Sequence, residues 1–203
     1  MKIILPDTIK RAEPNQWRQL GDITGEAFAN DPINQWIFGK PAAITSMFTV
    51  LARELYIKHG HCYLAGDGGA TMWLPPEAGA APTISGLLRF ALAQLRHGTI
   101  GGIKRGLAVS ALMEEWHPKD PHMYLFSIGT RQSARGKGVG KALLAPVLAA
   151  CDEAKMPVYL ENSNPDNSGF YGAHGFERMG TFEVCEGGPI MEPMWREPRA
   201  PIS

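Results

Sequence analysis

The sequence of 203 residues predicts one mixed α/β domain, and three observations support this fold class. Helical spacing of apolar residues dominates the first half, and short apolar runs alternate with helical ones in the second half. The chain shows no internal repeat and no linker long enough to separate domains. Helices followed by alternating strands and helices are typical of a sheet covered by helices. We therefore expect residues 1–203 to fold as a single domain.

The first half is predicted to be mainly helical, with one hairpin. Pro14–Phe28 carries an apolar stripe at helical spacing, and Asn30-Asp31-Pro32 ends that helix. A second helical pattern covers Pro41–His59. Two strand-like runs, His61–Ala65 and Ala70–Leu74, flank a Gly-rich turn. A glycine-rich link between short apolar runs predicts a β-hairpin.

The second half is predicted to alternate between helices and strands. Thr83–Arg96 is amphipathic, and a further helical segment reaches Trp116. Val139–Ala154 has one apolar helical face, and Pro146 within it should kink the helix or remove a backbone hydrogen bond. Strands are expected over Met123–Ile128 and Pro157–Leu160, followed by a short helix over Asn167–His174. Two final strands are expected over Phe176–Cys185 and Ile190–Trp195.

Composition excludes several classes of protein. The chain has 20 Lys+Arg against 20 Asp+Glu, which argues against a general binder of nucleic acid or of a membrane surface. No stretch approaches the ~20 apolar residues that span a bilayer. The three cysteines are scattered, which is typical of a reducing compartment. The histidines lack metal-ligand spacing. The apolar run at the N-terminus is too short for a signal peptide. We expect a cytoplasmic protein with no metal site.

A glycine-rich loop lies between a predicted strand and a predicted helix. Glycines let backbone approach a ligand closely, and the N–H groups of a helix N-terminus favour an anion. The loop lacks the Ser or Thr of the GxxxxGK[ST] motif and the third glycine of GxGxxG, so ATP and NAD are disfavoured while a pyrophosphate fits. Its residues are Arg135, Gly136, Lys137, Gly138, Val139, Gly140 and Lys141.

Two motifs in this region resemble the GNAT superfamily of acyl-CoA-dependent N-acyltransferases. Arg135-x-x-Gly138-x-Gly140 matches its Q/R-x-x-G-x-G/A signature. The stretch from Asn167 to Phe176 matches an N-x-x-F-Y-x-x-x-G-F pattern at the distance expected for the next strand and helix. Within the superfamily the chain is similar to bacterial enzymes of the puromycin N-acetyltransferase type, through His117-Pro118-Lys119-Asp120-Pro121 and Met72-Trp73-Leu74-Pro75-Pro76-Glu77.

The resemblance implies a fold and a cosubstrate. The fold would be a mixed, mostly antiparallel sheet of six to seven strands that splays at its centre, flanked by helices. The cosubstrate would be acetyl-CoA, with its pyrophosphate on the glycine loop and its thioester carbonyl near the end of the central strand. The implied acetyl-CoA-binding residues outside the loop are Ile128, Gly129, Thr130, Asn162, Asn167 and Tyr171.

The resemblance also places Tyr171 where the family's general acid lies, although a role in packing is the alternative. The general base is left open among Glu161, Glu26, Asp31, His174 and a chain of water molecules. Glu161 stands out because it ends an apolar strand, although it can also be a solvated strand end or make a structural hydrogen bond. Glu26 and Asp31 are candidates for recognising a cationic substrate or are simply exposed. Trp36 and Trp73 are candidate walls of the acceptor site or core residues.

The expected function is transfer of an acetyl group to a primary amine of a small molecule by direct attack on the thioester. The helical segment 83–116 carries little of the resemblance and is expected to shape the acceptor site. A protein or peptide N-acetyltransferase and a non-catalytic acyl-CoA sensor are the alternatives. No nucleic-acid or membrane partner is expected, and a homodimer is left open.

Overall fold

The structure is a computed structural model that describes residues 1–78 and 84–200. A single mixed sheet is the central layer, with strand order β1-β2-β3-β4-β5-β8-β6 and β7 pairing with β8. All neighbouring strands are antiparallel except β4 and β5. The strands in the described part of the chain are β1 Lys10–Arg11, β2 His61–Ala65, β3 Gly69–Leu74, β4 Met123–Thr130, β5 Val158–Asn162, β6 Glu177–Arg178, β7 Phe182–Glu183 and β8 Ile190–Arg196.

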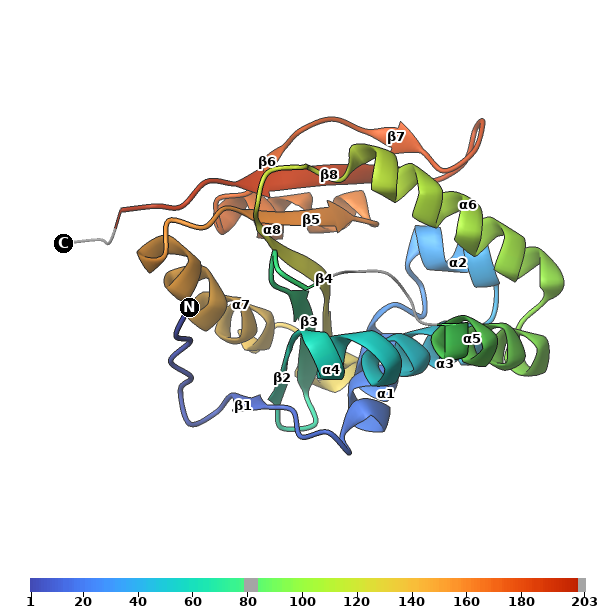
Figure 1. Cartoon of the computed structure of the whole chain (residues 1–203), viewed down its shortest axis with the longest axis horizontal. Helices are drawn as coiled ribbons and strands as arrows, with labels where there is room; N and C mark the ends of the chain where they lie inside the picture. The colour runs from blue at the N-terminus through green and yellow to red at the C-terminus, as the bar shows by residue number, and fades with distance from the viewer. Residues whose placement is uncertain (79–83, 201–203) are drawn as a thin grey trace.

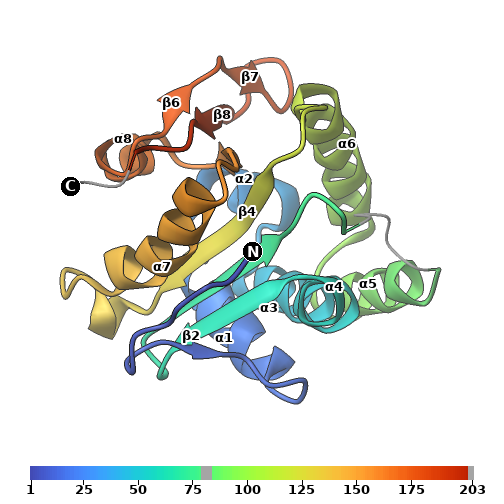
Figure 2. The ribbon, with the colours of Figure 1, turned by 60° about the vertical axis from the view of Figure 1, so that its left-hand side comes forward.

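Helices cover both faces of the sheet (Figure 1). One apolar cluster joins α1, α2 and α3 to the sheet, and a second joins α7 and α8 to its other face. The α5–α6 pair extends away from α7 in both views (Figure 2) and packs against α3 and α2. The helices are α1 Trp17–Ala27, α2 Pro32–Phe38, α3 Pro41–Leu51, α4 Ile57–His59, α5 Ile84–His97, α6 Ile100–Trp116, α7 Val139–Glu153 and α8 Ser168–Ala173.

The parallel strands β4 and β5 pair only where they begin. Met123 is opposite Val158 and Tyr124 is opposite Tyr159, and no later residue pair is registered between these two strands. Beyond that point β4 continues to pair with β3 while β5 pairs with β8. The edge of β4 that faces β5 therefore presents backbone groups from alternate residues with no strand partner. The predicted splay at the centre of the sheet is confirmed.

The long helix predicted over Pro41–His59 is confirmed, with one irregularity. Its middle is a π-helical turn, η1, at Ala52–Tyr56. Turns of this kind widen a helix locally and are frequent at functional sites. The turn directs Tyr56 inward, where its ring stacks on Phe126 of β4 with centroids 4.5 Å apart. No described helix is long and apolar enough to cross a membrane.

Three details of the sequence prediction are wrong. Asn30-Asp31-Pro32 does end α1, but the same residues also begin α2, which was not expected. The single strand expected over Phe176–Cys185 is two short strands, β6 and β7. Between them, three residues (179–181) lie opposite two residues of β8 (192–193), and this extra residue shifts the register by one. The short strand β1 was also missed. The predicted helix start at Thr83 lies outside the described residues.

An ion pair ties α7 to the last strand. Both terminal nitrogens of Arg196 donate to Asp152, at 2.6 and 2.7 Å, and the Arg196 Nε–H donates to the His174 carbonyl. Arg196 is buried, with a side chain 4% exposed, so its charge depends on this partner. Burial raises the pKa of Asp152, but the hydrogen bonds from Arg196 and the Arg199 N–H outweigh it and leave that pKa lowered.

We expect Asp152→Asn to lower the free energy of unfolding by about 3 kcal/mol, because it leaves the Arg196 guanidinium buried without a counter-charge. The folded-state pKa of Asp152 is lowered, so its stabilisation is present above the unfolded value and is lost as pH falls through the folded one. Urea unfolding of the wild type and the variant should therefore show a difference in the free energy of unfolding at pH 7 that shrinks below about pH 4.

The neighbouring substitution Glu153→Gln is the control, because Glu153 is exposed on the same helix turn. It should change stability by less than about 0.5 kcal/mol. A difference for Asp152→Asn that is equally small at pH 7 would contradict the structural role of this ion pair.

Candidate active site

A large cavity lies where β4 and β5 diverge. Its volume is about 870 Å³, and its wall is built by both splayed strands together with α2, α3, η1, α5 and α6. Aromatic and aliphatic side chains form most of that wall. The aromatic residues along it are Phe28, Phe38, Phe48, Tyr56, Phe90, Tyr124, Phe126 and Tyr171. The shape and lining are typical of a small-molecule site.

Glu161 and Tyr171, the two candidate acid–base residues, both line this cavity. Glu161 lies on β5 with its side chain 2% exposed. Its Oε2 accepts a hydrogen bond of 2.7 Å from the Tyr124 hydroxyl. Its Oε1 has no hydrogen-bond partner within the described residues. A buried carboxylate with one free oxygen facing a cavity is suited to accept a proton there.

Tyr171 is on α8 and is 8% exposed. Burial, with a smaller contribution from the charge of Asp31, raises the pKa of its hydroxyl well above the ordinary tyrosine value. The phenol therefore keeps its proton through the physiological range and can donate it only to a strong base. A departing thiolate is a weaker base than a tyrosinate, so burial works against this transfer, and the hydroxyl can pass its proton to sulfur only while the C–S bond is breaking.

The glycine loop lies between β4 and α7. Gly136 and Gly138 have φ of 73° and 76°, which an L side chain rarely adopts. A Cβ at either glycine would meet nothing within 4 Å, so the surface of the loop is open. The N–H groups that follow Gly138 begin α7 and have no carbonyl partner within the helix.

Lys137 and Lys141 are exposed beside these N–H groups, and no described carboxylate lies within 4 Å of either ammonium. The loop therefore offers positive charge and free donors for a pyrophosphate, as acetyl-CoA requires. In addition, Val139 and Gly140 fall in the first turn of α7, where a Cβ on Gly140 would lie 3.3 Å from the Phe170 ring.

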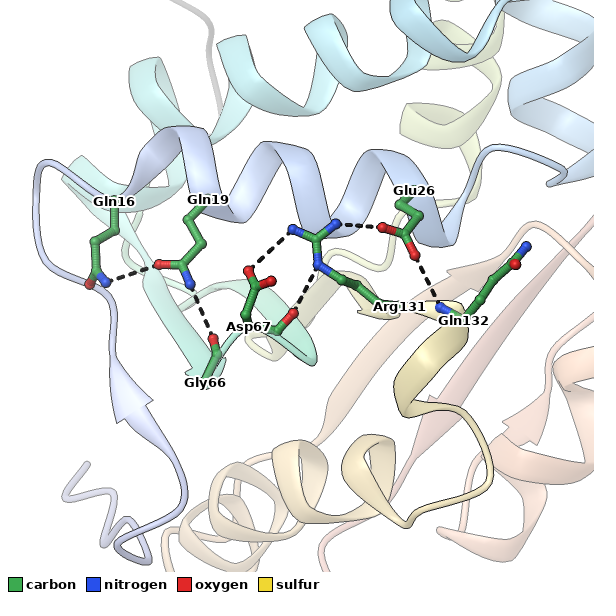
Figure 3. A network of polar contacts seen from close by, with 7 residues as sticks. All are labelled: Gln16, Gln19, Glu26, Gly66, Asp67, Arg131 and Gln132. Atoms are coloured by element: carbon green, nitrogen blue, oxygen red, sulfur yellow. Dashed lines mark hydrogen bonds and ion pairs between the residues drawn. The ribbon is translucent and has the colours of Figure 1, made fainter.

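Glu26 positions this loop from the end of α1 (Figure 3). Its carboxylate pairs with the Arg131 guanidinium and accepts the Gln132 N–H at 3.1 Å. Arg131 also pairs with Asp67 of the β2–β3 turn at 3.2 Å. The hydrogen bond from Arg131 lowers the pKa of Glu26. Glu26 does not line the cavity, so the structure places it as a loop anchor rather than as a substrate contact.

The end of β4 is the expected contact for the thioester. Ile128 lines the cavity, whereas Gly129 and Thr130 do not. A Cβ on Gly129 would lie 2.8 Å from the Ala27 Cβ of α1. This glycine is therefore required by the close approach of α1 to the strand, and only its backbone is available to a ligand. Arg135 donates to the Ala27 carbonyl at 3.2 Å, which holds the loop against the same helix.

Three other candidate residues have structural partners. Asp31 caps α2, accepting the Asn34 N–H at 2.9 Å, and it also accepts the Ser163 hydroxyl. Burial raises the pKa of Asp31 against these hydrogen bonds. Asn162 is buried and donates to Glu192 at 2.8 Å. Trp73 is fully buried in the cluster under α7, on the face of the sheet opposite the cavity.

Trp36 of α2 is partly buried, and the Arg105 guanidinium lies 5.6 Å from its ring. Among the residues that line the cavity, Asp31, Trp36, Trp73 and Asn162 are absent, whereas Asn167 is present. The substrate-binding side chains expected from the sequence are thus not the ones that face the cavity.

Sequence reasoning missed two histidines and a tyrosine beside Glu161. His117 follows α6, His122 precedes β4, and Tyr124 lies on β4. The signals in the sequence were their position around the strand that leads to the glycine loop and the family-like motif that begins at His117. The His117 ring lies 4.8 Å from the His122 ring and 5.1 Å from the Tyr124 ring. No group of three or more His, Cys, Asp or Glu in the described ranges is arranged to hold a metal ion.

Comparisons with known proteins agree with this geometry. Residues 86–176 match the Acetyltransferase (GNAT) family. An uncharacterised N-acetyltransferase of Schizosaccharomyces pombe is 27% identical over 184 residues, which cover 82% of this chain and 73% of the yeast protein. A structure described as histone acetyltransferase HPA2 and related acetyltransferase, from Corynebacterium glutamicum, has 25% identity and a TM-score of 0.67 over 97% of this chain and 98% of that chain.

The fold is also shared with arylalkylamine N-acetyltransferase 2 from Aedes aegypti, at a TM-score of 0.58 and 12% identity, over 94% of this chain and 98% of that chain. A splayed mixed sheet with an anion-binding loop at the divergence is the architecture of an acyl-CoA-dependent transferase. The family match over residues 86–176 and the likeness to these acetyltransferases support assignment to the GNAT superfamily and an N-acetyltransferase activity. Enzymes of this family use acetyl-CoA.

We expect Tyr171→Phe to lower kcat at least tenfold and to leave the affinity for acetyl-CoA nearly unchanged, because only the proton donor is removed. Thiol release measures kcat, and calorimetric titration measures affinity. Tyr63→Phe is the control, since Tyr63 is a buried tyrosine of β2 outside the cavity. Equal turnover in the two variants would remove the Tyr171 hydroxyl from the chemistry.

Proposed function

We propose that this enzyme acetylates the primary amine of a small molecule that carries an apolar ring. The observation that carries the proposal is the cavity at the splay, whose lining includes Glu161 and Tyr171 together with many aromatic side chains. Its volume of about 870 Å³ lies within the usual range for small-molecule sites, roughly 300–1,000 Å³. A peptide substrate would favour an open groove instead.

Charge in the cavity suits a protonated amine. The described lining includes one lysine but five carboxylates, which attract an ammonium group from solution. One of them, Glu54, is already paired with Lys58 at 2.9 Å and with Arg89 at 3.2 Å. The five acidic residues are Glu54, Glu77, Glu114, Asp120 and Glu161.

The side chains divide the work of the reaction. Acetyl-CoA supplies the acetyl group as a thioester, and an N–C bond forms as the C–S bond breaks. The ammonium loses one proton before attack, and the nitrogen loses a second as the amide forms. Glu161 is placed to accept a proton from the amine, and the Tyr171 hydroxyl to protonate the departing sulfur. Backbone N–H groups on the free edge of β4 can stabilise the developing oxyanion.

A bulky residue at the cavity wall should test the acceptor site. Ser110 and Ala108 are both exposed on α6, but only Ser110 lines the cavity. We expect Ser110→Trp to raise KM at least fivefold for a ring-bearing amine and to leave KM for acetyl-CoA unchanged. Ala108→Trp should change neither constant. Equal effects of the two substitutions in steady-state assays would show that α6 does not border the acceptor.

A thiol-release assay over a panel of amines should decide between the alternatives. We expect turnover with arylalkylamines and aminonucleosides to exceed turnover with polyamines and with a histone-tail peptide by at least tenfold in kcat/KM. The peptide is included because the Corynebacterium structure is described as a histone acetyltransferase. Preference for the peptide would support a protein acetyltransferase, and binding of CoA without turnover would support a sensor.

A further inference from the structure

Glu161 has to release a proton in every catalytic cycle if it acts as the base, a premise that rests on the proposed function. Each turnover removes two protons from the ammonium nitrogen and returns only one to sulfur. The side chain of Glu161 is 2% exposed, so direct loss of the proton to bulk water is restricted. The Tyr124 hydroxyl occupies Oε2, which leaves Oε1 as the oxygen that can take and return the proton.

His117 connects this buried oxygen to solvent. Its Nδ1 lies 3.7 Å from Glu161 Oε1, and its side chain is 32% exposed against 2% for Glu161. The loop after α6 carries His117 over the splayed strands, and its ring meets Tyr124 and Tyr159 edge-on at 5.1 and 5.0 Å. One side of the imidazole therefore faces the carboxylate while part of the ring is reached by water.

His122 determines which nitrogen of His117 carries a proton. The His122 Nδ1 lies 2.7 Å from the Asp120 carbonyl, which can only accept, so Nδ1 is the protonated nitrogen of His122. In neutral His122 the Nε2 is then an acceptor, and it lies 3.1 Å from the Nε2 of His117. His117 must donate at Nε2, and its Nδ1 is left with a lone pair directed at Glu161.

A lone pair facing a carboxylate is favourable only with a proton between them. We propose that His117 closes from 3.7 Å to hydrogen-bond distance and takes the proton from Glu161, breaking the Oε1–H bond and forming the Nδ1–H bond, and then releases the proton to water. His122 is a positioning residue, because it keeps the Nδ1 of His117 free to accept. The two histidines thus form the proton exit of the acceptor site.

Other ionisable groups around Glu161 do not compete for this proton. Tyr56 of η1, Tyr124 of β4 and Tyr159 of β5 face the same carboxylate. Burial, with the charge of Glu161, raises the pKa of all three hydroxyls, so they stay neutral. Burial lowers the pKa of His122 despite its hydrogen bond to Asp120, which favours the neutral ring that fixes the tautomer.

The proton arrangement can be measured without turnover. In two-bond ¹H–¹⁵N spectra of the ¹⁵N-histidine-labelled protein at pH 8, we expect His122 as the Nδ1–H tautomer and His117 as the Nε2–H tautomer. His122→Gln should keep His117 in this form, because the glutamine Oε1 can accept the same N–H. His122→Leu should release His117 to a mixture. A His117 ring protonated at Nδ1 alone would overturn the proposal.

Kinetics should then separate the exit from the reaction itself. We expect His117→Gln to lower kcat/KM for the amine at least tenfold, because the buried Glu161 carboxylate then has no imidazole beside it to pass its proton to water. His122→Leu should follow His117→Gln, and His122→Gln should stay within threefold of wild type.

An unchanged kcat/KM in His117→Gln would overturn the proton exit while acetyl transfer stands. A wild-type protein that turns over no amine would instead overturn the proposed function. In that case the tautomers in the spectra still decide whether the His122–His117–Glu161 arrangement exists.

Discussion

The divergence of two parallel strands is the constraint on which the rest of this molecule depends. β4 and β5 pair over only two residues, and each then follows its antiparallel partner. The gap exposes one backbone edge for the thioester and creates the cavity between the strands. It also places Glu161 of β5 and Tyr171 of α8 along the lining of the same cavity. A sheet paired along its whole length would have neither feature.

Charged residues near this gap mostly hold its two sides in place. Glu26 and Asp67 hold Arg131 at the base of the glycine loop, and Asp31 joins α2 to the residue that follows β5. On the far side of the sheet, Asp152 fixes the end of α7 to Arg196. The loop can therefore present its free N–H groups in one conformation, which limits the ordering cost of binding a pyrophosphate.

Local sequence patterns predicted the fold well. The spacing of apolar residues indicates helices and strands, and the positions of glycines indicate turns. The segment from β4 to α8 shows this most clearly. The roles of single side chains were harder to predict. Asp31 looked like a free carboxylate, but Pro32 after it was the signal of a helix start. Trp73 of β3 packs under α7, whereas His117 after α6 lines the cavity, and tertiary packing decides both placements.

The α5–α6 pair has a consequence for how this enzyme can diversify. It borders the cavity through Leu87, Phe90 and Met113, yet it is anchored on α2 and α3 and lies away from the glycine loop. Substitutions there can reshape the amine site while the acetyl-CoA site and the acid–base pair keep their geometry. Selection can thus change which amine is accepted while the catalytic residues and the acetyl-CoA site stay the same.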